Sequence, residues 1–561
     1  MKKTILKSLY ILFIQMLSIL LAEEKPITIE LNTPLGRIKG SFMTTRLERN
    51  IYSFRGMRYA EPPVGRRRFK QAEPVKPWKG IFDASVEGPA CPQPGNSSDI
   101  SEDCLRLNVY TNQLPTSLNA VKKPVIVYFH PGAFYAGSAQ SNFPGPQYLL
   151  DKEVVLVTVN YRLASLGFIS TGDSLLPGNL GLKDQVAALR WVKKYIAAFG
   201  GNPDCVTITG YSAGGWSVTL HLVSPMSRGL FHRVIAMSGS AVFQEPFPKH
   251  QKHLAIKQAQ LLHCPTDNVQ NILNCLNTKS AEEIANTLDE FFEWYDNPIW
   301  IWTPVIEPIV PGVERFLTDD PAKLIREGKF EQVPFIAGVT RDEIIDIIIL
   351  AKEEAKKGNS SMFNDLNTKW EEIAPIIFVY ERNTTKSRQI SKELKSFYIH
   401  DEPITVNNLQ GIAGIYRDSL ISYSVHRLIN LLSASSCKPV YYYHFIYQGR
   451  FSHDLDPDTN KPYGVTHHDD LMYIFYIKQF PLFKKDDPET RIVERMTAIW
   501  ENFAKTGKPI PRDNELFENV SWKKFTPQCK RHLEIGNELV MRNGLINPKE
   551  MALWDKLFPL P

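Results

Sequence analysis

The chain has 561 residues, of which 43% are hydrophobic and 22% are charged, values typical of a folded soluble protein. This composition excludes intrinsic disorder, collagen-like repetition and a multi-span membrane protein. The formal net charge of +5 falls to +2 without the first 22 residues, which hold three of the lysines. No strong electrostatic field is therefore available to bind a nucleic acid or another polyanion.

Residues 1–22 are predicted to be a signal peptide. A basic start, MKKTILK, precedes an apolar run of 15 residues, SLYILFIQMLSILLA, which suits a signal-peptide core and is short for a membrane span. We expect cleavage after Ala22, although Leu20 is larger than the residue usually preferred there. The alternative is an uncleaved anchor. Later runs are too short or too polar to span a bilayer, and we see no retention signal or lipid-anchor tail, so we expect a secreted protein.

From residue 27 onwards, strand-like and helix-like segments alternate. After an extended stretch at 27–42, six short and almost continuously apolar runs are predicted as strands that are covered on both faces: 125–129, 154–159, 206–210, 234–238, 334–338 and 439–445. Helical patterns such as residues 182–199 lie between them. The alternation predicts an α/β fold with the functional site at the carboxyl ends of the strands. Because no repeat or long linker interrupts it, we expect residues 23–561 to form a single domain.

The cysteines and the glycosylation sequons agree with export. Two cysteine pairs lie in polar, turn-rich sequence, as small loop-closing disulfides would: Cys91 with Cys104, and Cys264 with Cys275. Cys205 precedes a strand-like run and is predicted to be a buried free thiol, whereas pairing of Cys437 with Cys529 stays open. No spacing favours a zinc site. The asparagines of the four sequons are Asn96, Asn359, Asn383 and Asn519.

A serine lies in the sequence context of a nucleophile elbow. Gly210-Tyr211-Ser212-Ala213-Gly214 follows the predicted strand at 206–210 and opens into a helical pattern. The sharp turn of such an elbow needs small residues on both sides of the serine and exposes its hydroxyl above the sheet. The alternative is a glycine-rich turn with an idle serine.

An acyl-transfer reaction at this serine would also need donors for the developing oxyanion. The segment His130-Pro131-Gly132-Ala133-Phe134 follows the predicted strand at 125–129. Its small residues would let main-chain N–H groups approach a carbonyl oxygen, but Pro131 cannot donate. Gly132, Ala133 and Ala213 are therefore the candidate donors. The alternative is that this segment is only a structural turn, since small residues are common in turns that follow a strand.

Several ordered segments resemble the type-B carboxylesterase/lipase family, the group that includes the cholinesterases, over about residues 27–558. They are FRGMRYAEPPVG at 54–65, SEDCLRLN at 101–108, GNLGLKDQ at 178–185, FGGNP at 199–203 and GYSAGG at 210–215. The resemblance implies an α/β-hydrolase fold, with a large, mostly parallel central sheet flanked by helices, and a reaction without cofactor or metal. It also implies the two small disulfides given above and two buried ion pairs, Arg68 with Glu102 and Arg162 with Asp184.

By the same resemblance, the catalytic triad is Ser212, Glu343 and His467. Glu343 stands in a segment that is similar to the family's acid segment, and His467 stands in GVTHHDDL at 464–471, which resembles its histidine segment. The neighbours Asp342 and His468 are the alternatives at these two positions. In the resulting mechanism His467 takes the Ser212 proton, Glu343 orients the imidazole, and an acyl-serine forms and is hydrolysed.

The chain departs from the family pattern in ways that bear on the substrate. Tyr211 stands where most members have glutamate, and the loop between Cys91 and Cys104 has only 12 residues and no tryptophan. Cholinesterases bind the choline cation with a tryptophan of that loop. We therefore predict uncharged hydrophobic esters as substrates and choline esters as poor ones.

The family's acyl pocket is formed near residues 298–302, which makes Trp300 and Trp302, together with Tyr211, tentative pocket residues; the alternative is that the two tryptophans are core. We thus expect a secreted serine carboxylic ester hydrolase whose partner is a small-molecule ester. The alternatives are a lipase of the same family and, from another class, a non-enzymatic adhesion protein. The sequence predicts neither the physiological ester nor the oligomeric state.

Overall fold

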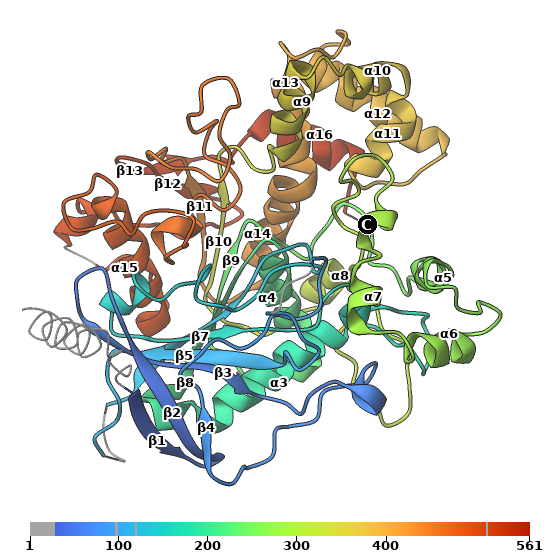
Figure 1. Cartoon of the computed structure of the whole chain (residues 1–561). Helices are drawn as coiled ribbons and strands as arrows, with labels where there is room; N and C mark the ends of the chain where they lie inside the picture. Colours follow the sequence, from blue (N-terminus) through green and yellow to red (C-terminus); the bar gives the residue numbers. More distant parts are fainter. Residues whose placement is uncertain (1–27, 96–98, 118–120, 512–513, 561) are drawn as a thin grey trace, which may run out of the picture.

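The computed structural model describes residues 28–95, 99–117, 121–511 and 514–560. The predicted signal peptide and the first sequon, Asn96, lie outside these residues. Figure 1 shows the described chain arranged around one large sheet, with the yellow and orange helices gathered beyond one end of it.

The sheet has 13 strands among the described residues. Its order is β1-β2-β3-β5-β7-β6-β8-β9-β10-β11-β12-β13, and β4 pairs with β2. All neighbours from β7 to β12 are parallel, whereas β1, β2, β3, β5 and β13 run antiparallel to their neighbours on that path. The strands are β1 (Thr28–Thr33), β2 (Gly36–Thr44), β3 (Asn50–Arg58), β4 (Ile81–Asp83), β5 (Arg106–Thr111), β6 (Lys123–Phe129), β7 (Val155–Val159), β8 (Gly201–Tyr211), β9 (Arg233–Met237), β10 (Phe335–Thr340), β11 (Val440–Phe445), β12 (Arg531–Ile535) and β13 (Leu539–Asn543).

The six predicted strands are confirmed as β6 to β11, the parallel centre of the sheet. Every residue of β7 and of β10 is buried, and each strand is apolar except for one threonine, as expected where both faces of a sheet are covered. Alternate residues of β6 pack into different cores on the two faces, Val127 into one and Ile126 into the other.

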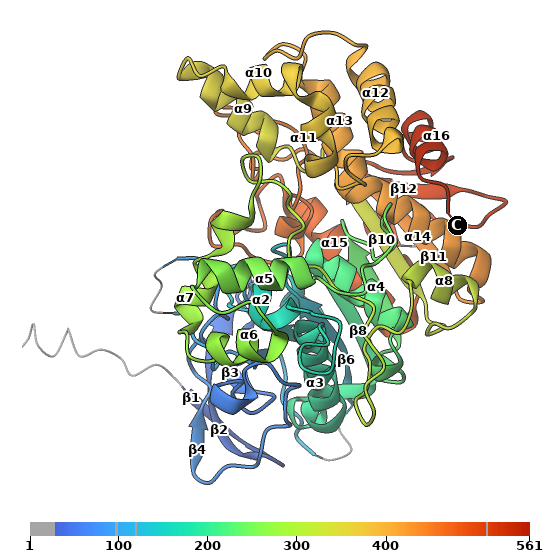
Figure 2. The same ribbon diagram turned by 90° about the vertical axis from the view of Figure 1, so that its right-hand side faces the viewer.

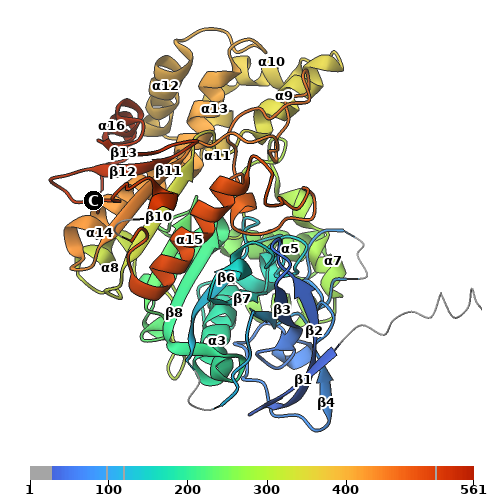
Figure 3. The same ribbon diagram turned by 90° about the vertical axis from the view of Figure 1, so that its left-hand side faces the viewer.

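Helices cover both faces of the sheet. Figure 2 shows α3, α4 and α14 on one face, and Figure 3 shows α15 on the opposite face. The α-helices of the described residues are α2 (Ala164–Phe168), α3 (Leu180–Tyr195), α4 (Ala213–Val223), α5 (Lys252–Leu261), α6 (Val269–Leu276), α7 (Ala281–Ala285), α8 (Pro321–Arg326), α9 (Asp346–Lys356), α10 (Ser361–Thr368), α11 (Trp370–Ile377), α12 (Thr385–Ile399), α13 (Leu409–Arg417), α14 (Tyr423–Ser435), α15 (Thr490–Thr506) and α16 (Pro548–Leu557).

The disulfides expected from the sequence are confirmed: Cys91 is bonded to Cys104, and Cys264 to Cys275. The other three cysteines are free, and Cys205 is half-buried where a fully buried thiol was expected. The two expected ion pairs are also present, with 2.6 Å between Arg68 Nε and Glu102 Oε1 and between Arg162 Nη2 and Asp184 Oδ1.

Of the three sequon asparagines that the structure describes, Asn383 and Asn519 are exposed and Asn359 is half-buried. The Nδ2 of Asn359 donates to Glu354 Oε2 at 2.6 Å. None of the helices in the described residues is long and apolar enough to cross a membrane.

Candidate active site

Ser212 occupies the turn between β8 and α4. It has φ 53° and ψ −118°, a backbone conformation that residues other than glycine rarely adopt. The turn is tied to the next strand, because the N–H of Ser212 donates to the carbonyl of Met237 at 2.9 Å. A Cβ at Gly214 would collide with the carbonyl of Phe129, so this glycine lets α4 begin close against β6. The strand–turn–helix context of the motif is thus present.

His467 is held by a buried carboxylate. A hydrogen bond of 2.5 Å joins His467 Nδ1 to Glu343 Oε2, and because a carboxylate only accepts, Nδ1 carries the hydrogen and Nε2 is the ring nitrogen left to accept a proton. The second oxygen of Glu343 accepts from Ser238 Oγ at 2.6 Å and from the N–H of Thr340 at 2.7 Å. Three donors therefore fix the carboxylate that orients the imidazole.

The topology explains why these residues meet. β8, β9, β10 and β11 are consecutive parallel strands. Ser212 follows β8, Ser238 follows β9 and Glu343 follows β10, while His467 lies in the segment after β11. The carboxyl ends of parallel strands share one edge of a sheet, so residues up to 255 positions apart in the chain come together at this edge.

Ser212 and His467 both line a cavity of about 440 Å³. The cavity also reaches two of the predicted oxyanion donors, Gly132 and Ala133. Most of the remaining wall is hydrophobic or aromatic, which suits an apolar ligand. The other lining residues are Tyr135, Phe292, Asp296, Asn297, Ile299, Trp300, Ile344, Asp346, Ile347, Leu350, Tyr416, Leu420 and His468.

The predicted oxyanion donors are available. The N–H groups of Gly132, Ala133 and Ala213 donate to no acceptor in the described part of the chain. Ala213 is the first residue of α4, where main-chain N–H groups have no partner within the helix and favour negative charge. Gly132 has φ 110° and a Cβ there would collide with the carbonyl of Ala136, so this position of the loop requires glycine.

The two alternative residues have other contacts. The carboxylate of Asp342 accepts from the N–H of Val465 at 2.9 Å and from Arg341 Nε at 2.8 Å, so it braces the segment before His467 and does not contact the imidazole. Burial, with further lowering by His467, holds the pKa of His468 well below its usual value. His468 is therefore neutral at physiological pH.

Tyr211 does not line the cavity, and the prediction that it does is wrong. Its side chain is fully buried in the core on the other face of the sheet from α4, because successive strand residues point to opposite faces. Its hydroxyl accepts from the N–H of His468 at 2.7 Å, and its ring centroid lies 4.9 Å from that of His467. Tyr211 thus holds the segment of His467 and His468 in place from the core side, without reaching the cavity.

The two tryptophans have different positions. Trp300 lines the cavity and stacks on Trp216 with ring centroids 4.8 Å apart. Trp302 is only 1% exposed and packs against Phe291; it lines no part of the cavity, so its prediction as a pocket residue is corrected to core. Residues 300–302 belong to no helix or strand, so the two tryptophans do not share one face as residues two positions apart do in a regular strand.

The sequence prediction missed other residues of the site. Ser238, which holds Glu343, follows a predicted strand, and its place at the strand's carboxyl end was the available signal. Phe292, Tyr416 and Leu420 reach the cavity from segments that carry no motif. No group of three or more His, Cys, Asp or Glu side chains among the described residues is arranged to hold a metal ion.

Comparisons with known proteins identify the family of the chain. A family model described as the carboxylesterase family matches residues 27–554. The chain belongs to the carboxylesterase family. It is 38% identical to esterase FE4 of Myzus persicae, over 87% of this chain and 86% of that protein, and 34% identical to juvenile hormone esterase of Tribolium castaneum, over 88% and 86%.

The fold comparison points the same way. The structure of juvenile hormone esterase from Manduca sexta with OTFP covalently attached is similar with a TM-score of 0.83 and 26% identity, covering 95% of this chain and all of the other. The fold is therefore the α/β-hydrolase fold, and the protein is a carboxylic ester hydrolase.

Proposed function

We propose that the protein hydrolyses uncharged hydrophobic esters through an acyl-serine intermediate, with Ser212 as the nucleophile, His467 as the base and Glu343 as the acid. One observation carries the assignment: His467 is hydrogen-bonded to the fully buried Glu343 and shares a cavity with Ser212, which lies in a strained turn at the start of α4. A nucleophile, a base and a group that orients the base are the parts that this chemistry needs.

The reaction follows from these positions. His467 Nε2 takes the Ser212 proton as the hydroxyl oxygen bonds to the ester carbonyl carbon. The N–H groups of Gly132, Ala133 and Ala213 hold the oxyanion that develops. The alcohol leaves with the proton from His467, and a water activated by the same nitrogen then hydrolyses the acyl-serine and releases the acid.

The substrate class rests on the cavity wall. The aromatic and aliphatic side chains around Ser212 favour an apolar ester. The loop between Cys91 and Cys104 also lacks the tryptophan with which cholinesterases bind the choline cation. We also propose that the protein is secreted, which its two disulfides favour.

The test is Ser212→Ala. Because this change removes only the hydroxyl, the variant should fold like the wild type and lose turnover of short- and medium-chain p-nitrophenyl esters by several orders of magnitude. An organophosphate should label the wild type on Ser212 alone. Stoichiometric labelling of the Ser212→Ala variant would refute the assignment of the nucleophile, and turnover by that variant would support another mechanism.

A further inference from the structure

The loop that carries two of the oxyanion donors has an unusual backbone. Gly132, Ala133, Phe134 and Gly137 have φ of 110°, 50°, 65° and 102°. For residues other than glycine, here Ala133 and Phe134, this left-handed region is unfavourable. A loop of this kind keeps one shape only when surrounding contacts hold it, so the contacts that hold it decide where its N–H groups point.

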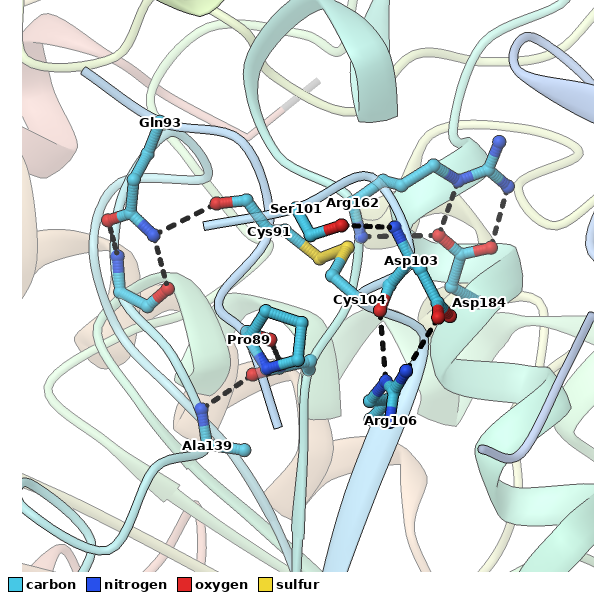
Figure 4. The surroundings of a disulfide bond; sticks show 12 residues. Pro89, Cys91, Gln93, Ser101, Asp103, Cys104, Arg106, Ala139, Arg162 and Asp184 are labelled. Atoms are coloured by element: carbon cyan, nitrogen blue, oxygen red, sulfur yellow. Dashed lines mark hydrogen bonds and ion pairs between the residues drawn. A yellow bond between two sulfur atoms is a disulfide. The ribbon is translucent and has the colours of Figure 1, made fainter. Parts of the chain in front are cut away.

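Gln93 lies in the loop that the Cys91–Cys104 disulfide closes, and its side chain forms two hydrogen bonds to Gly137 of the oxyanion loop, residues 132–137. Its Oε1 accepts from the N–H of Gly137 at 2.9 Å, and its Nε2 donates to the carbonyl of Gly137 at 3.0 Å. The same Nε2 donates to the carbonyl of Cys91 at 3.1 Å. Figure 4 shows the Gln93 side chain extending from the segment that contains Cys91 to a neighbouring segment of the chain. The Gln93 amide thus joins the two loops through both its oxygen and its nitrogen.

The loop of Gln93 is itself fixed. Cys91, two residues before Gln93, is bonded to Cys104. A second amide ties the same two segments, because Asn160 donates to the carbonyl of Pro89 at 2.9 Å and accepts from the N–H of Ala139 at 2.7 Å. Two side-chain amides therefore hold the far end of the oxyanion loop against the segment 89–93, and the disulfide ties that segment to Cys104.

We propose that Gln93 is a positioning residue that preorganises the oxyanion hole, an inference that rests on the proposed function of Gly132 and Ala133 as donors. An oxyanion hole is effective because its donors already point to where charge develops. If the hydrogen bonds of Gln93 are removed, the loop samples other conformations, and the transition state loses more stabilisation than the bound substrate does. The expected signature is a lower kcat with an almost unchanged KM.

The residue type fits this role. The amide offers a donor and an acceptor, which match the C=O and N–H of Gly137, whereas leucine offers neither and glutamate lacks the donor. Gln93→Leu should therefore remove both hydrogen bonds to Gly137, and Gln93→Glu should retain only the bond from the Gly137 N–H. Gln332→Leu is the matched control, because Gln332 is half-buried like Gln93, accepts from the N–H of Cys437 at 3.0 Å near the amino end of β10, and does not contact the oxyanion loop.

The experiment measures kcat and KM for a p-nitrophenyl ester, inhibition by an aliphatic trifluoromethyl ketone, and the unfolding temperature of each variant. A trifluoromethyl ketone adds to the serine and forms an oxyanion, so its affinity reports the hole directly. Removing one oxyanion donor outright lowers kcat by about 10²–10³. For a loosened loop we expect about a tenfold loss of kcat in Gln93→Leu and an equal loss of ketone affinity. Gln93→Glu should lose both in the same direction, because its second carboxylate oxygen would face the carbonyls of Gly137 and Cys91. Changes below about twofold are expected in Gln332→Leu.

Two results would overturn the inference: an unchanged ketone affinity in Gln93→Leu, or an equal loss in Gln332→Leu. If Gln93→Leu does not fold, Gln93→Glu gives the same comparison. Organophosphate labelling of the wild type keeps the two proposals apart. Wild-type protein that is not labelled at Ser212 contradicts the proposed function, whereas labelled wild type with unaffected Gln93 variants contradicts only the role of Gln93.

Discussion

Trp300 lines both the catalytic cavity and a second cavity of about 270 Å³. Trp300→Ala should therefore join the space of about 440 Å³ at Ser212 to the second space and admit longer acyl chains. The second cavity is also walled by Trp216 and Phe243, so the added room is mainly apolar. Each methylene buried there should contribute about 0.8 kcal/mol, or about fourfold in kcat/KM.

The assay is a series of p-nitrophenyl esters from acetate to laurate. If the joined space accepts three more methylenes, kcat/KM for the longest bound chain relative to butyrate should rise by about 60-fold over the wild-type ratio. The alanine variant should lose about 3–5 kcal/mol of stability, so Trp300→Phe gives a milder opening. Trp302→Phe is the control, because that ring lies in the core and lines neither cavity. An unchanged chain-length profile in a folded Trp300→Ala protein would show that Trp300 does not limit the acyl site.

Three further predictions concern the histidine segment. His467→Ala should lower kcat/KM by several orders of magnitude and His468→Ala much less, and the reverse order in a steady-state assay would show that His468 is the base. Tyr211→Phe should destabilise the protein by about 1–3 kcal/mol, because it leaves the buried N–H of His468 without its acceptor; denaturant unfolding that matches the wild type would contradict that. Burial raises the pKa of the Asp470 carboxyl to about 7 in the folded protein. Between its pKa in the unfolded chain and pH 7, the folded protein therefore binds one more proton than the unfolded chain does. The free energy of unfolding should fall by up to about 1.4 kcal/mol per pH unit as the pH rises through this range. Asp470→Asn should flatten this decline in unfolding curves measured from pH 5 to pH 8, and an equal slope in both proteins would refute the argument.

The centre of the fold could be predicted from the sequence because strands that are buried on both faces are almost continuously apolar. β6 to β11 are short apolar runs, and the glycine-rich turn at Ser212 has a spacing that few other structures require. β5 was missed although it is nearly all buried, because its polar Asn108 interrupts the pattern. In the structure that amide is satisfied by the N–H of Gly56 and the carbonyl of Ala139.

The sequence points to candidate site residues where the chemistry requires one residue type. It does not point to the residues that line the cavity, because many apolar side chains can fill those positions. The triad depended on the family resemblance, because Glu343 and His467 have no local signal that separates them from Asp342 and His468. The cavity wall depends on which way each side chain turns: Trp300 lines the cavity and Trp302 does not, although the sequence suggests both. The role of Tyr211 depended on a hydrogen bond across 257 positions of sequence, which only the fold creates.

The measurement that tests the acyl-serine mechanism most directly is rapid-quench mass spectrometry of the enzyme during turnover of a p-nitrophenyl ester. An acyl-enzyme predicts a burst of p-nitrophenol no larger than one equivalent of enzyme, whenever deacylation is the slower step, and a mass increase equal to the acyl group on the peptide that contains Ser212. Gln93→Leu should slow the formation of this adduct without moving it. An acyl group found on another residue, or turnover with no adduct under conditions where a slowly deacylating ester is saturating, would contradict the account.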